Sequence, residues 1–138
     1  MQPEVFALCD AATESQGKLN LLGAFDTIFA KSLPAVQLTC AIVARVRFLP
    51  SEIGEHSFRV LLRDPADKDL VPPFQGTLNV VFDEPDKPAR FNLIIGLAGL
   101  KFEAYGPHRA ELQFDGKRLA EMPFHVSMPR QAPTPAAG

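Results

Sequence analysis

Acidic side chains are concentrated in the segment 64–69, where carboxylates could bind a cation. The three aspartates of this segment are Asp64, Asp67 and Asp69. Carboxylate oxygens suit Ca²⁺, but the ion needs about six to eight oxygen ligands in a closed shell. The segment lacks the glycine and the terminal glutamate of an EF-hand loop, so other carboxylates, such as Asp10 or Asp26, would have to converge on it. The alternative, which we favour, is an ordinary solvated turn, and the acidic segment 83–88 is interpreted in the same way.

The histidines and cysteines are dispersed along the chain. His56, His108 and His125 lie far apart in the sequence, which favours separate surface or half-buried histidines over a metal-binding triad. Cys9 and Cys40 each lie in an apolar run, which favours two buried thiols that act as small hydrophobic groups. A disulfide between the two cysteines is the alternative.

No motif in the sequence indicates catalysis. None of the serines lies in a Gly-x-Ser-x-Gly turn, the arrangement that exposes a serine nucleophile between a strand and a helix. The glycine-rich loops that bind dinucleotides or phosphates are also missing from the sequence. We therefore predict that the protein is not an enzyme, and we assign no catalytic, cofactor-binding or metal-binding residue.

Length and charge limit the classes of partner. The 138 residues suit one domain, which we expect over residues 1–127, followed by a mobile tail rich in proline and alanine over 128–138. A net charge of -2 gives no overall attraction to nucleic acid or to an acidic membrane surface. The sequence shows no signal peptide and no apolar stretch near the ~18 residues of a membrane span. These features predict a cytoplasmic protein.

Short runs of alternating apolar and polar residues, separated by turn residues, predict the fold. Such a period of two residues is typical of half-buried strands. The clearest run is 36–48, where the even positions from Val36 and Leu38 to Phe48 are apolar and are expected on one face. We predict an all-β, antiparallel β-sandwich of about eight strands, immunoglobulin-like or similar. The predicted strands are 5–11, 19–25, 36–48, 58–62, 78–82, 91–97, 108–114 and 117–126, and residues 27–31 could form a single helical turn.

The strongest local prediction is the last hairpin. Asp115-Gly116 supplies the positive φ angles of a type I′ turn, which places Phe114 opposite Lys117 and Leu112 opposite Leu119. The apolar positions then change parity, so we expect a β-bulge near Ala120-Glu121. Pro123 indicates an edge position or the end of a pairing, because proline has no N–H to donate.

Four arginines would gather if the strands 36–48 and 58–62 were neighbours. Arg47 would then lie opposite or diagonal to Arg59, with two more arginines beside them: Arg45 and Arg63. Like charges across a ladder are destabilising, so this patch would need an acidic partner or a carboxylate from a third strand. The alternative is a mixed sheet face neutralised by residues such as Glu103 or Glu111. A connection that crosses between the two sheets would remove the premise.

Several apolar residues fall on faces predicted to be exposed: Val43, Leu61, Val81 and Ile94. If they adjoin, they form a larger apolar patch than a monomer usually exposes, which predicts a homodimer through a sheet face. The favoured function is therefore a non-enzymatic protein-interaction module that recruits a protein partner or a second copy of itself. The alternative is a ligand- or calcium-binding sandwich domain that uses the acidic loops at one end.

Some local phrases resemble a known family. They are Leu8-Cys9-Asp10-Ala11-Ala12, the segment from Gly17 to Asp26, the segment from Gly106 to Lys117, and Met122-Pro123-Phe124-His125-Val126. Together they resemble a family of small bacterial β-sandwich proteins of unknown function, over nearly the whole chain up to about Val126. These motifs are hairpins, so the resemblance implies a fold. It implies no substrate, cofactor or catalytic residue.

Overall fold

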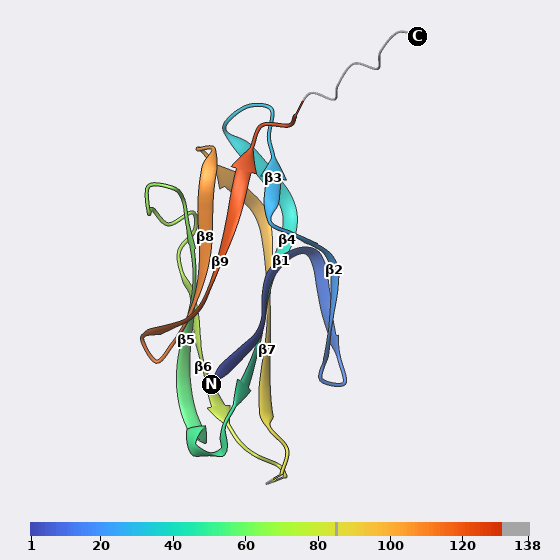
Figure 1. The fold of residues 1–138 in the computed structure, drawn as a ribbon, viewed down its shortest axis with the longest axis vertical. Coiled ribbons are helices and arrows are strands. Elements are labelled where there is room, and N and C mark those ends of the chain that lie inside the picture. The colour runs from blue at the N-terminus through green and yellow to red at the C-terminus, as the bar shows by residue number, and fades with distance from the viewer. Residues whose placement is uncertain (85, 131–138) are drawn as a thin grey trace.

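The computed structural model describes residues 1–84 and 86–130, and within them the chain forms nine strands in two facing sheets (Figure 1). One sheet has the order β2-β1-β4-β7, with bounds Lys18–Phe25, Gln2–Ser15, Ala35–Phe48 and Ala89–Phe102. The other has the order β3-β9-β8-β5-β6, with bounds Thr27–Phe29, Lys117–Ser127, Gly106–Phe114, Gly54–Arg63 and Phe74–Val80. A short 3-10 helix, Pro50–Glu52, precedes β5.

The predicted β-sandwich is confirmed, and each of the eight predicted strands has a counterpart. The ninth strand, β3, has no counterpart among the predicted strands. It forms within residues 27–31, where the sequence allows a single helical turn, and it pairs with β9 in parallel. Most of the predicted mobile tail, residues 131–138, lies outside the described residues, so that prediction and the domain boundary at residue 127 remain predictions.

The main core lies between the two sheets. Its largest fully buried side chains include Phe48, Phe102 and Phe124, one from each of β4, β7 and β9. The alternation of β4 explains its contribution, because Cys40, Ile42, Ala44, Val46 and Phe48 all point into the space between the sheets. Burial of such apolar side chains is the dominant favourable term in folding.

The alternation of β4 reverses near its start, which the sequence analysis did not predict. Val36 and Leu38 are 53% and 77% exposed, although they share the parity of buried Cys40. The register places Gln37 opposite Leu100 and Thr39 opposite Ala98, with Leu38 and Gly99 between these pairs. Gly99 has φ +67°, a left-handed conformation that favours glycine. This irregularity turns the side chains of both strands onto the other face.

The hairpin of β1 and β2 folds over the outer face of the β4–β7 sheet. The carbonyl oxygen of Gly17, in its turn, accepts hydrogen bonds from Arg45 Nη1 at 2.9 Å and Asn92 Nδ2 at 3.2 Å. A second, smaller core fills the space beneath. We call it the hairpin core, and it consists of Cys9, Ala41 and Val43 with Val5, Ala12, Leu19, Leu21 and Ile94 packed against them.

The predicted apolar patch is not exposed. Val43 and Leu61 are 0% and 2% exposed, and Ile94 is half-buried in the hairpin core. Only Val81 of the four residues is exposed. The four residues therefore do not form the exposed apolar patch on which the sheet-face dimer was predicted.

The cysteines lie on opposite faces of the same sheet. Cys9 belongs to the hairpin core and Cys40 to the main core. Both are buried free thiols, as predicted, and the alternative disulfide is wrong.

The last hairpin forms largely as predicted. Asp115 and Gly116 have φ angles of 51° and 79°, and Phe114 lies opposite Lys117. The bulge comes slightly earlier than expected, because Gln113 pairs with Arg118 and Leu112 pairs with Ala120 instead of Leu119. Pro123 precedes the segment of β9 that pairs with β3, which begins at His125. β9 lies between β3 and β8, so Pro123 is not on an edge strand but lies just outside the pairing of β9 with β3, where its missing N–H costs no hydrogen bond in that ladder.

Candidate functional site: the free edge of β7

The aspartates of the segment 64–69 are held by their own loop and by two arginines. Asp64 Oδ1 accepts hydrogen bonds from the backbone N–H groups of Ala66 and Lys68, both at 2.9 Å. Asp69 Oδ1 lies 3.0 Å from Arg63 Nε, and Asp67 forms ion pairs with Arg63 and Arg109. Within residues 1–84 and 86–130, no group of three or more His, Cys, Asp or Glu side chains could hold a metal ion. Asp10 and Asp26 therefore do not converge with this loop.

The arginine patch considered in the sequence analysis does not form. β4 and β5 lie in different sheets, so Arg45 and Arg47 are separated from Arg59 and Arg63. Arg45 Nε lies 3.3 Å from Glu4 Oε1, and Arg63 pairs with the 64–69 loop. The connection between the strands crosses between sheets, which is the case that removes the premise. The two proposed neutralising residues have local partners instead: Lys101 for Glu103 and Arg118 for Glu111.

The histidines lie apart, as the sequence analysis expected. His108 is buried between the rings of Phe102 and Phe124, with Nδ1 2.9 Å from the carbonyl oxygen of Gly106. His125 is exposed on β9. His56 lies at the other end of the sandwich, where it contacts Asp115.

The least protected feature of the fold is the edge strand β7. It is 14 residues long, and among the described residues its hydrogen-bonded neighbour is β4 alone. Between Arg90 and Lys101 the segment 91–100 carries no charged residue and no proline. Its residues Phe91 to Ile95 are all half-buried, on both faces of the strand. A long apolar edge of this kind is a template for pairing with another chain.

The other edge strands are blunted. β3 is only three residues long. β6 has seven residues, follows Pro72-Pro73, and exposes polar side chains on its outward face: Gln75, Thr77 and Asn79. β2 begins with exposed Lys18 and contains Gly23 at φ +68°. Short length, proline, lysine and local twist are the devices by which proteins prevent unwanted strand pairing, and β7 has none of them between residue 91 and Ala98, before the irregularity at Gly99.

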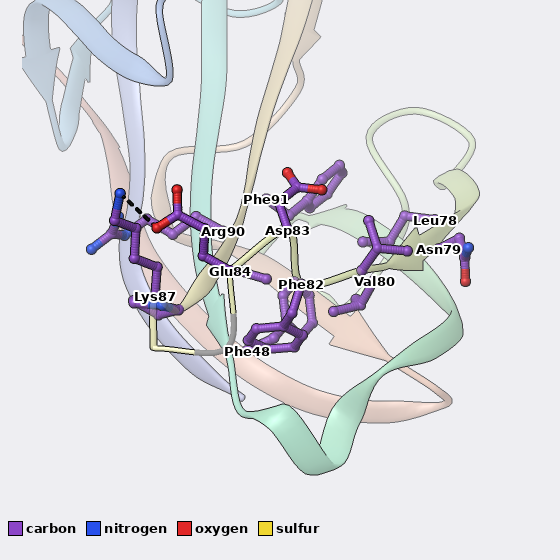
Figure 2. A pocket seen from close by; sticks show the side chains of 13 residues that line it. Phe48, Leu78, Asn79, Val80, Phe82, Asp83, Glu84, Lys87, Arg90 and Phe91 are labelled. Atoms are coloured by element: carbon purple, nitrogen blue, oxygen red, sulfur yellow. Dashed lines mark ion pairs between the residues drawn. The ribbon is translucent and has the colours of Figure 1, made fainter.

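A cleft joins the start of β7 to the end of β6 (Figure 2). It has a volume of about 480 Å³. Its apolar lining comes from both sheets and from the loop after β6: Phe48, Leu78, Val80, Phe82 and Phe91. Figure 2 shows Lys87 and Arg90 on one side of the cleft and Leu78 on the other. The cleft is therefore apolar inside, with charged groups from Asp83, Glu84, Lys87 and Arg90 at its rim.

Aromatic rings hold the inner face of β7 at this cleft. The centroid of Phe91 lies 5.4 Å from that of Phe58 on β5 and 6.4 Å from that of Phe114 on β8. Phe58 in turn covers Gly76 of β6, where a Cβ would come within 2.8 Å of its ring. The glycine on β6 thus makes room for the ring that supports β7.

A charged histidine lies behind the cleft. His56 stacks on Phe48, with ring centroids 5.8 Å apart. Its Nδ1 is 2.6 Å from Asp115 Oδ2 and its Nε2 is 2.6 Å from the carbonyl oxygen of Glu52. Since an ionised carboxylate and a carbonyl only accept, both ring nitrogens must donate and the ring is protonated. The hydrogen bond to Asp115 and then that to Glu52 raise the pKa of His56, and the same contact lowers the pKa of Asp115.

Sequence reasoning found the strand 91–97 but not its place at the edge. The available signal was the run Leu93-Ile94-Ile95, which is apolar on both faces. Ile94 was assigned to an exposed face, whereas it packs against the hairpin core. Which strand becomes an edge depends on pairing between distant segments, and the alternation pattern does not contain that information.

Comparison with known proteins places this geometry in a family. A family model described as a family of unknown function (DUF6941) matches residues 4–127. The chain belongs to this family. The match confirms the resemblance to an uncharacterised family and covers all nine described strands except the first two residues of β1. Family membership assigns no activity to the β7 edge.

Searches of curated proteins and of solved structures assign no function to the chain. No curated protein matches the chain. A crystal structure of an immunoglobulin-like protein from Pseudomonas aeruginosa is 15% identical, covers 86% of this chain and 90% of that chain, and has a TM-score of 0.39. Within the part of the chain that the structure describes, no helix is long and apolar enough to cross a membrane.

Proposed function

We propose that this member of the family is a non-enzymatic protein-interaction module that accepts an extended segment at the free edge of β7. The observation that carries the proposal is the uncharged segment 91–100, half-buried from Phe91 to Ile95, on a 14-residue strand that pairs with β4 alone among the described residues. The free edge of a strand presents unpaired N–H and C=O groups. An added strand would satisfy these groups, which is a recurring mode of peptide recognition.

The side chains around β7 would supply selectivity. Alternate residues of an added strand point to opposite faces. One set would lie near the half-buried rings of Phe91 and Phe58, and the other near Asn92 and Ile94 on the outer face. The cleft at the start of β7 offers room for a larger apolar side chain.

The alternative function, a calcium- or ligand-binding domain built on the acidic loops, has less support. Asp64, Asp67 and Asp69 already have hydrogen-bond or ion-pair partners. A bacterial source and a cytoplasmic location belong to the proposal too, supported by the family resemblance and by the sequence features described above. The net charge of -2 supports a protein partner over nucleic acid or an acidic membrane.

A displayed library of extended nine-residue peptides tests the proposal, with the purified chain at nanomolar concentration. Enriched peptides should carry alternating apolar residues. Each is then made in two N-methylated forms, one at odd and one at even amides, which remove hydrogen-bond donors without changing side chains. Strand addition predicts that one form loses binding at least tenfold and the other does not.

The site is located with two matched lysine variants. A side chain at Gly96 meets no atom within 4 Å and needs no positive φ, so Gly96→Lys should fold and blunt the β7 edge. Thr77→Lys places the same charge on exposed β6 and should leave binding unchanged. Peptides that bind Gly96→Lys as well as the natural chain, or that bind equally in both N-methylated forms, would overturn the proposal.

A further inference from the structure

We propose that the occupant of the β7 edge is β7 of a second copy of this chain, paired antiparallel about a twofold axis at Ile94. This inference rests on the proposed function, because it names the partner of the same edge. Antiparallel pairing of two identical edges is isologous, which is the symmetry of most homodimers. It would join two four-stranded sheets into one continuous sheet.

The faces of β7 restrict the possible registers. Up to Ala98, odd residues such as Phe91 and Leu93 point to the main core and even residues such as Asn92 and Ile94 point outward. A slip of one residue exchanges the two faces of a strand. Continuous inner and outer faces therefore require odd residues to lie opposite odd residues. This requirement excludes the like-charge pairing of Arg90 with the partner's Lys101.

The length of the regular segment selects one of the remaining registers. Regular alternation ends at Gly99, where φ is +67°. β7 begins at Ala89, and 90–98 is the longest segment centred on one residue that extends up to this irregularity. Its centre is Ile94, so the antiparallel pairing that uses the whole segment places Ile94 opposite the partner's Ile94.

This register gives compatible pairs on both faces. On the inner face, Phe91 lies opposite the partner's Leu97 and Leu93 opposite the partner's Ile95. On the outer face, Asn92 lies opposite the partner's Gly96 and Arg90 opposite the partner's Ala98. Gly96 and Ala98 are exposed in the single chain. No pair sets like charges against each other, and the small residues leave room for the side chains opposite them.

A second copy explains why β7 alone is unprotected. The hairpin of β1 and β2 covers the outer face near Asn92, but among the described residues no strand pairs with the free edge. A second β7 would pair with the free backbone N–H and C=O groups of this edge and would place apolar side chains beside apolar side chains. The dimer therefore forms through a sheet edge, in contrast to the sheet-face dimer predicted from the sequence.

Position 98 provides a direct test of this register, because it lies opposite the partner's Arg90. In Ala98→Lys, the new lysine of each copy faces the other copy's Arg90, so the dimer contains two like-charge pairs across the ladder. In Ala98→Glu, the same two positions hold pairs of opposite charge. The dimer dissociation constant is measured by sedimentation equilibrium of the full chain. We expect it to rise at least tenfold for Ala98→Lys and to fall severalfold for Ala98→Glu, with Thr77→Lys unchanged.

A second substitution separates repulsion from misfolding. Arg90→Gln in the Ala98→Lys background removes the like charge and should restore the dimer, and circular dichroism should show the same strand content in every variant. A chain that stays monomeric at high micromolar concentration would overturn the inference. So would a dimer whose dissociation constant is the same for Ala98→Lys, Ala98→Glu and the natural chain. If such a chain still binds peptides that Gly96→Lys rejects, the proposed function stands without the second copy.

Discussion

Leu38 and Gly99 occupy the gap in the register of β4 and β7 at which both strands exchange their inner and outer faces. On one side of the gap Leu97 is buried, and on the other side Leu100 and Phe102 are buried. Gly99 has a positive φ and would meet no atom with an added Cβ. Its conformation, and not a lack of space, is therefore what a side chain would disturb.

Gly99→Ala should lower the free energy of unfolding by about 1 kcal/mol, because alanine resists a positive φ. The matched control is Gly96→Ala on the same strand, where φ is ordinary and no atom lies within 4 Å. Its free energy of unfolding should stay the same or rise by up to about 1 kcal/mol, through the lower entropy of the unfolded chain. Urea unfolding measures both. Equal effects of the two substitutions would show that the irregularity at Gly99 does not depend on glycine.

Gly76→Ala should destabilise the protein by about 1 to 3 kcal/mol, the usual cost of overpacking. Its Cβ would come within 2.8 Å of the Phe58 ring, which in turn packs against Phe91 and Phe114. Thr77→Ala, next to it on exposed β6, is the control. Thermal unfolding reports stability, and peptide binding at β7 should weaken along with it. An unchanged midpoint for Gly76→Ala would contradict the contact between Phe58 and β6.

Protonated His56 should make stability depend on pH. Its pKa is raised in the folded protein by Asp115 and the Glu52 carbonyl, so its stabilising contribution is complete below the ordinary pKa of about 6.5. That contribution is lost as pH rises through the higher folded pKa. The pKa of Asp115 is lowered in the folded protein. Its stabilising contribution is therefore present above its ordinary pKa of about 3.9 and is lost as the pH falls through the lower folded pKa. The melting temperature should therefore peak at mildly acidic pH.

The substitution Asp115→Asn isolates this pair, because asparagine tolerates the positive φ of 51° at that position. It should flatten the fall in melting temperature between pH 6 and 9, as followed by thermal unfolding at several pH values. His125→Gln, at an exposed histidine, should keep the full pH dependence. The same slope in Asp115→Asn and the natural chain would show that His56 does not carry the effect.

Arg45 should hold the β1–β2 hairpin against the sheet. Its Nη1 lies 2.9 Å from the Gly17 carbonyl oxygen, and the hairpin core with fully buried Cys9 lies beneath. Arg45→Ala should therefore speed the reaction of Cys9 with a thiol reagent, measured in a chain that carries Cys40→Ser. Arg47→Ala, on the same strand and exposed, is the control. Equal labelling rates in the two variants would mean that the hairpin does not depend on Arg45.

The sequence predicts the strands of this fold better than their arrangement. Alternation locates the interior of β4 and β5, and Asp115-Gly116 fixes the last turn, because these features depend on neighbouring residues. The placement of Arg45 and Arg59 in different sheets depends on a crossing connection that no local pattern records. The burial of Val43 likewise depends on the β1–β2 hairpin, which folds back from a distant part of the chain.

The candidate site follows the same division. The sequence shows that residues 91–100 are uncharged, but the edge position of β7 among the described residues emerges only from the strand order of the sheet. The interaction module that we propose therefore has its candidate site at this strand edge, and the patch of Val43, Leu61, Val81 and Ile94 is no longer a candidate because only Val81 is exposed.

Residue-resolved amide hydrogen exchange tests the central claim most directly. It would be measured on dilute chain, with and without a saturating peptide from the library. Strand addition at β7 predicts that alternate amides between residues 90 and 98, those that point away from β4, become protected when the peptide binds. Protection confined to other regions, such as the 64–69 loop, or no change in β7, would contradict the account.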